Sequence, residues 1–300
     1  MAVPGFLAGP QLEWNEVLGE YLQFAGYFLA IGAVGYRYLV LPRLSPEANA
    51  QSLLGRETAA TLGMIGVLLL LLSALGSVEM NAVLHHKSFS DSLPKNVARF
   101  QFKIGALTLA LAGFTLARRA SARFGWPVAA VGILLTALQP LAALRLGGAV
   151  NAIHVLAAST WLGTLTVMLF SAIRALAQGA TRDGSRQRIT ADIVNRFSPV
   201  ALTAAVVLAL TGLTTAWLHL KRISSLWETN YGRMLILKLC LVAGVVALGG
   251  WNWKRTKPAL GLEGNEESVT RIERSARAEV VMGAIVLLAT AILVSLPSPK

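Results

Sequence analysis

The chain has 300 residues, of which 55% are hydrophobic and only 14% are charged, and its formal net charge is +12. Soluble globular proteins carry about 25% charged residues, and disordered chains are poor in apolar residues, so the composition excludes both classes. In a soluble protein the positive charge would indicate nucleic-acid binding, but in a membrane protein it reports which loops face the cytoplasm. The composition therefore indicates a protein whose main partner is the lipid bilayer, with no nucleic acid.

Eight apolar segments are long enough to cross a hydrocarbon core of about 30 Å as helices. In chain order they are residues 17–40, 58–80, 98–117, 127–145, 149–173, 197–220, 231–252 and 277–296. The apolar residues do not alternate with polar ones, as residues 66–72 show, which excludes the strands of a membrane barrel. The sequence predicts an all-α fold, a polytopic membrane helix bundle of about eight transmembrane helices, in which residues 1–300 form one integral membrane domain.

The segments between these runs are short. We expect a tight turn at Leu146-Gly147-Gly148, between the fourth and fifth runs, and polar linkers at residues 178–195 and 254–275. Because no Lys or Arg precedes Arg37, the first run does not resemble a signal peptide and is expected to stay in the mature protein. The sequence shows no phosphate-binding glycine loop and no Ser-His-Asp grouping, so we predict no enzymatic activity.

Basic residues predict the orientation. An even number of spans puts both termini on one side, and the loops after spans one, three, five and seven carry most of the 27 Lys and Arg residues. Those loops are expected in the cytoplasm. The sequence therefore predicts a multi-pass protein of the bacterial inner (plasma) membrane with both termini on the outer, periplasmic side.

Tryptophan is enriched at both membrane–water interfaces, and six of the seven tryptophans fit that pattern. The expected outer ones are Trp14, Trp217 and Trp227, and the expected inner ones are Trp126, Trp251 and Trp253. Trp161 lies well inside the fifth span.

With this orientation all four histidines lie toward the outer face. His85 and His86 are in the loop after the second span, His154 is about five residues into the fifth, and His219 is at the outer end of the sixth. Imidazole is a ligand for copper, zinc, nickel and haem iron. The histidines are therefore candidate metal ligands.

Two methionines and a carboxylate share this outer half. Met80 ends the second span beside Glu79, and Met234 lies one turn into the seventh span. A thioether favours Cu(I) over harder ions. Met80 and Met234 also have a plainer explanation, which is packing between helices.

The histidines have plainer explanations too. His85 and His86 could be a solvated pair, His219 an interfacial anchor beside Trp217, and His154 the partner in a helix–helix hydrogen bond. His154 is the strongest candidate, because an ionisable side chain at hydrocarbon depth usually faces the bundle interior and has a function.

The fifth span has one face of interest. Helical spacing predicts that Asn151, His154 and Trp161 share this face, with Trp161 as the floor of a site. Gly163 and neighbouring small residues would allow another helix to approach closely. Lys238, about seven residues into the seventh span, could extend its ammonium outward, and Lys103, near the interface, needs no special role.

Several motifs in the second half resemble the CopD family of bacterial copper-resistance membrane proteins. Residues 154–163 resemble an "HxxAaxxWxG" helix, and residues 196–198 resemble an "RFS" helix start that is followed by Thr211-Gly212. Residues 231–239 are similar to a "YGRxxxxKL" helix, and residues 274–279 to an "RSxRxE" helix start. The resemblance covers about residues 150–298.

The resemblance implies copper handling at the inner membrane, often together with a small periplasmic copper protein, CopC. It places His154 at an intramembrane histidine of the family and His219 near the outer end of the sixth span. His85 and His86 have no counterpart in these motifs.

Three functions stay open at this point. The first is copper transport or delivery across the inner membrane, with copper ion taken up at the outer face by His and Met ligands. The second is binding of a single haem b between two spans, for example by His154 and His219. The third is a non-catalytic subunit of a larger membrane complex.

Overall fold

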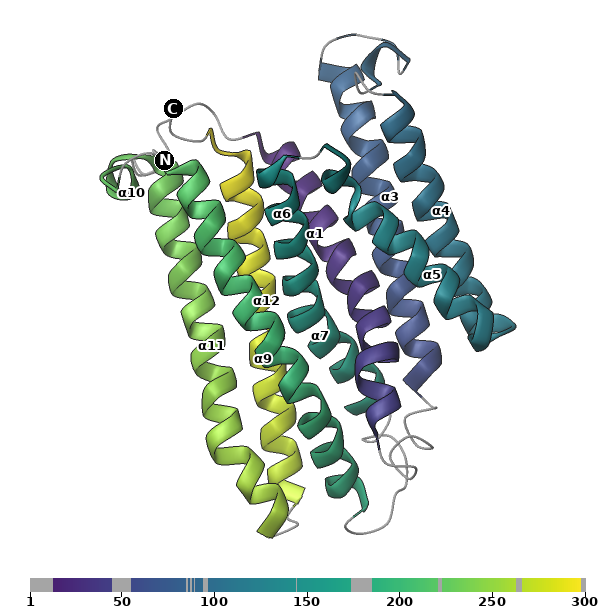
Figure 1. Ribbon diagram of the computed structural model, residues 1–300, viewed down its shortest axis with the longest axis vertical. Helices are drawn as coiled ribbons and strands as arrows, with labels where there is room; N and C mark the ends of the chain where they lie inside the picture. The colour runs from purple at the N-terminus through teal and green to yellow at the C-terminus, as the bar shows by residue number, and fades with distance from the viewer. Residues whose placement is uncertain are drawn as a thin grey trace, which may run out of the picture.

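The computed structural model describes residues 13–44, 55–84, 86, 88, 90–93, 97–143, 145–173, 185–220, 223–262 and 266–297. Throughout these ranges the regular structure is helical and contains no strand. Figure 1 shows the helices packed side by side along one common direction. The predicted all-α membrane bundle is confirmed.

Within the described ranges, seven helices are long and apolar enough to cross a membrane, and an eighth is shorter. The ten α-helices are α1 (Trp14–Gly35), α3 (Arg56–Leu84), α4 (Val97–Arg119), α5 (Ala122–Ala137), α6 (Leu146–Ala158), α7 (Thr164–Met168), α9 (Ser185–His219), α10 (Ser225–Glu228), α11 (Asn230–Leu262) and α12 (Glu266–Ser295). The π-helical turn Ser159–Gly163 joins α6 to α7, and a second one, Leu169–Ile173, follows α7, so that together they form one continuous span.

The long helices run alternately up and down. The start of α1 and the end of α12 lie at the same end of the bundle, which we call the upper end, and the α4–α5 turn lies at the lower end (Figure 1). This agrees with the prediction that both ends of the bundle domain face the same side. Which side of the membrane that is stays a prediction.

The fourth span differs from its prediction. Helix α5 has 16 residues, about 24 Å at 1.5 Å per residue, and is followed by the 3₁₀ turn Gln139–Ala143. Pro140 explains the early end, because proline has no N–H to donate to the Thr136 carbonyl and its ring would clash with that carbonyl in a continued α-helix. The tight turn predicted at Leu146-Gly147-Gly148 is wrong, since these residues form the first turn of α6.

Both predicted polar linkers are largely helical. Helix α9 begins at Ser185, α11 continues to Leu262 and α12 begins at Glu266. These helices therefore extend beyond their apolar runs, which hydropathy alone does not detect.

The central helices approach one another at glycines. A Cβ on Gly163 would collide with the carbonyl of Phe28, and a Cβ on Gly32 would collide with the backbone of Gly163, so α1 lies directly against the fifth span. A Cβ on Gly26 would lie 2.7 Å from the Gly66 carbonyl oxygen of α3. The predicted close approach at Gly163 is confirmed, and α1 is the helix that makes it.

One tryptophan does not face a membrane–water interface, although the sequence pattern predicts that it does. Trp126 is only 2% exposed and packs edge-to-face on Phe114, with ring centroids 5.6 Å apart. It lies near the beginning of α5, at a span end as predicted, but it faces the core between α4 and α5 and not the membrane–water interface. Four others are exposed near the ends of helices or apolar spans, as expected: Trp14, Trp217, Trp227 and Trp251.

Candidate metal-binding site

His154 lies where α6 meets α9, with Lys238 of α11 nearby. Its Nδ1 is 3.0 Å from the Thr211 hydroxyl of α9, and its ring packs on Gly212 of the same helix. The ammonium of Lys238, on α11, lies within electrostatic range. We call His154, Thr211, Gly212 and Lys238 the His154 site.

We assign the tautomer of His154 from its contact with Thr211. The Thr211 hydroxyl has a single proton, and its Oγ lies 2.7 Å from the Val207 carbonyl oxygen, to which it donates. With the hydroxyl proton directed at the Val207 carbonyl, we assign the bond to His154 the other direction, from Nδ1–H to the threonine oxygen. Nε2 is left unprotonated, with its lone pair available to a metal ion.

This arrangement is typical of a metal-binding histidine. Such residues donate their other ring nitrogen to a nearby oxygen, which fixes the ring orientation and raises the basicity of the ligating nitrogen. Thr211 provides that oxygen from a neighbouring helix. In the sequence Thr211 is part of a motif only, and no signal there indicates its pairing with His154.

Gly212 makes room for the imidazole. A Cβ at this position would lie 3.3 Å from His154 Cε1, closer than most carbon contacts in proteins. The glycine therefore allows α6 and α9 to approach at the level of the histidine ring.

Met234 lies above this site on α11. It is buried in a small apolar cluster with Tyr231, Leu235, Ala289 and Leu293. The packing role considered for Met234 therefore fits its surroundings.

Residues of α9 border the same cluster. Ala216 and Leu220 pack against it, and His219 lies between them in the chain, although its side chain is outside the described residues. His219 is eight residues beyond Thr211, about 12 Å along the helix. His154 and His219 are thus at clearly different depths.

The remaining candidates are less closely connected to this site. His86 is exposed, with a left-handed backbone at φ 49°, and Glu79 and Asn151 are exposed as well. His85 and the side chain of Met80 lie outside the described residues. Their proposed role as ligands stays a prediction.

Trp161 is buried, as expected for a residue inside the span. However, the π-helical turn Ser159–Gly163 begins between His154 and Trp161, and it changes the helical register on which their shared face was predicted. Its role as the floor of the site stays a prediction. Among the described residues, no group of three or more His, Cys, Asp and Glu side chains could hold a metal ion together.

Comparison with known proteins finds a family match in the last three long helices. Residues 191–293 match the family model of CopD, copper resistance protein D. We call this matched stretch the CopD segment. This CopD segment includes Thr211, Gly212 and Lys238, whereas His154 precedes it and approaches it from α6.

A curated relative points the same way. The copper transport protein CutJ of Bacillus subtilis (strain 168) is 29% identical over 147 residues, which are 49% of this chain and 25% of the relative. The chain thus spans about a quarter of the length of that relative. No solved structure matches. The CopD resemblance seen in the motifs is confirmed.

A polar network outside the CopD segment was missed by the sequence interpretation. Lys103 of α4 donates to Gln23 Oε1 at 2.9 Å, and Gln23 Nε2 donates to Glu20 at 3.3 Å. Lys103 therefore joins α4 to α1, contrary to the expectation that it needs no special role. The three-residue spacing of Glu20 and Gln23 was a signal, because it puts both on one helix face.

Proposed function

We propose that this protein transports or delivers copper across a bacterial inner membrane and is not an enzyme. The observation that carries the proposal is the hydrogen bond from His154 Nδ1 to Thr211, which leaves Nε2 free as a ligand at hydrocarbon depth. The CopD segment and the similarity to a copper transport protein support copper as the transported ion.

Copper would be taken up at the upper end, on the periplasmic side. His85, His86 and Met80 would collect the ion, His219 and Met234 would receive it, and His154 would bind it deeper in the bundle. The difference in depth between His219 and His154 supports successive sites over a single four-histidine centre. A CopC-like periplasmic protein would supply the copper.

Lys238 fits transient binding. A cation near His154 is repelled by the Lys238 ammonium, so the site binds copper more weakly than one lined by carboxylates. Transport requires that an ion can leave each site as well as enter it. The monovalent Cu(I) suffers less repulsion here than Cu(II) and is the form we propose.

His154→Gln separates this function from a simple helix–helix hydrogen bond. A glutamine amide can still donate to Thr211, but it does not replace imidazole as a copper ligand. We expect His154→Gln and His154→Ala each to slow Cu(I) uptake into proteoliposomes loaded with a Cu(I) chelator by at least about tenfold. Ile153→Ala, an exposed neighbour on α6, is the matched control.

Normal copper uptake by the His154→Gln protein would contradict the proposal, because His154 would then serve only as the partner in a helix–helix hydrogen bond. The absorbance spectrum of the purified protein tests the haem alternative in the same preparation. A Soret band that disappears in His154→Ala would show that His154 binds haem. Haem binding would then replace copper transport as the proposed function.

A further inference from the structure

Helices α4 and α5 form a V that opens toward the upper end (Figure 1). Near the lower end they touch through glycines: a Cβ on Gly113 or Gly125 would collide with the backbone of the opposite helix. Toward the upper end α5 stops at Ala137, and the following 3₁₀ turn packs against α6. The early end of α5 therefore leaves a groove between the two helices.

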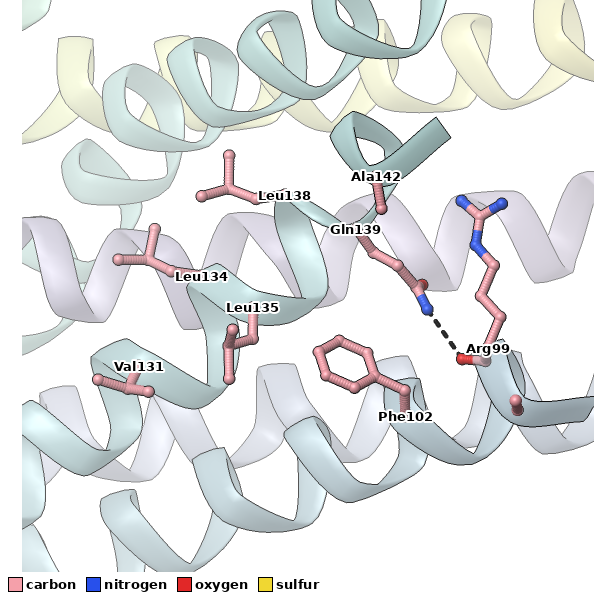
Figure 2. Close-up of a pocket in the computed structure, with 9 residues that line it drawn as sticks. Arg99, Phe102, Val131, Leu134, Leu135, Leu138, Gln139 and Ala142 are labelled. Carbon is pink, nitrogen blue, oxygen red and sulfur yellow. Dashed lines mark hydrogen bonds between the residues drawn. The ribbon is translucent and has the colours of Figure 1, made fainter. Parts of the chain in front are cut away.

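The groove has a volume of about 790 Å³ and is mostly apolar. Its apolar lining side chains are Phe102 of α4 and Val131, Leu134, Leu135 and Leu138 from α5 and the residue after it. In Figure 2 the Phe102 ring projects into the space beside Leu135 and below Leu138. Phe102 is 48% exposed, so the groove opens on the outside of the helix pair.

Polar groups are confined to one end of the groove. There Gln139 donates to the backbone carbonyl of Arg99 at 2.8 Å, and Figure 2 shows the Arg99 guanidinium extending to the side of Ala142. Arg99 lies in the first turn of α4, at the upper end of the bundle, where a lipid headgroup region begins. An apolar groove with a cation at the end that lies in the headgroup region matches the chemistry of a phospholipid.

We propose that a phospholipid binds in the α4–α5 groove, with an acyl chain along Phe102, Leu135 and Leu138 and its phosphate at Arg99. The helices span a bilayer, so the solvent that reaches an outward-facing apolar groove is lipid. Helix α5 covers only about 24 Å of a core of about 30 Å, and a bound lipid fills the volume that this short helix leaves. Arg pairs with phosphate through charge-assisted hydrogen bonds.

Native mass spectrometry of the purified full-length protein tests this lipid site. We expect wild-type protein to retain one phospholipid through detergent washing. Arg99→Gln removes the phosphate contact and should lower the retained fraction about tenfold. Leu135→Trp fills the groove and should abolish retention. Arg118→Gln, at the other end of α4, and Leu109→Trp, an exposed position outside the groove, are the controls and should match wild type.

Exchange with defined lipids then tests the headgroup. Phosphatidylethanolamine and phosphatidylglycerol should both be retained, because they share the phosphodiester, and diacylglycerol should be lost. Equal retention of diacylglycerol, or wild-type retention by Arg99→Gln and Leu135→Trp, would overturn the proposal. So would a dimer that Leu135→Trp dissociates, since a second copy of the chain would then fill the groove.

Discussion

His154 owes its chemistry to one residue on another helix. The Thr211 hydroxyl donates a hydrogen bond to the Val207 carbonyl and accepts one from His154 Nδ1–H, which leaves Nε2 free. An intramembrane histidine with an unprotonated ring nitrogen is a useful copper ligand, whereas the other tautomer would point an N–H at the ion. The sequence identified His154 as the strongest candidate because of its depth, but it did not identify the partner.

Thr211→Val tests this role of the threonine. Valine has nearly the same shape but offers no oxygen, so the imidazole loses the bond that orients it. We expect copper affinity to fall about 10–100-fold, as measured by competition with a Cu(I) chelator. Thr214→Val is the matched control, because Thr214 also donates to a carbonyl of its own helix, in a bond that is exposed. Equal affinities of the two variants would contradict the assigned tautomer.

At the scale of whole helices, glycine determines which neighbours touch. The contact of α1 with the fifth span depends on Gly32 and Gly163, and the contact of α4 with α5 depends on Gly113 and Gly125. In lipid there is little hydrophobic drive between helices, so close backbone packing at small residues is a main source of stability. The sequence predicted the small face around Gly163 but not the identity of the opposite helix.

Gly163→Ala should destabilise the bundle. The added methyl group meets the Phe28 carbonyl, which is backbone and cannot rotate away, and overpacking of this kind costs about 1–3 kcal/mol. We expect a lower melting temperature in a thermal-shift assay in detergent. Gly147→Ala has open space around its new Cβ and should melt like wild type. An unchanged melting temperature for Gly163→Ala would show that α1 does not pack here.

Across the whole molecule, burial is uneven. More than half of the apolar window in the span of α1 is buried, compared with 11% for Ile189–Leu218 and 17% for Asn230–Trp251. Helices α9 and α11 thus lie at the periphery, whereas α12, at 39%, is more buried and packs on α1. The His154 site forms where α9 meets the central fifth span. Membrane topology would determine from which side the proposed copper ion reaches this site.

Cysteine labelling tests the orientation. In a Cys240→Ala background, Glu13→Cys lies at the upper end and Ala120→Cys in the α4–α5 turn at the lower end, and both positions are exposed. Because the positive-inside rule places the upper end in the periplasm, a membrane-impermeant maleimide should label Glu13→Cys in intact spheroplasts. Ala120→Cys should react only after permeabilisation. The reverse pattern would invert the proposed direction from which copper is taken up.

The sequence alone determined that this chain is a helical membrane bundle, because apolar runs of about 20 residues can satisfy their backbone hydrogen bonds in lipid only as helices. It also supplied the CopD motifs and the candidate ligands. The tertiary structure decided that Thr211 and Lys238 flank His154, that Lys103 bonds to Gln23, that Trp126 is buried, and that a short α5 leaves a groove. These depend on which helix faces become neighbours, and hydropathy does not encode that choice, since lipid-facing and helix-facing sides are equally apolar.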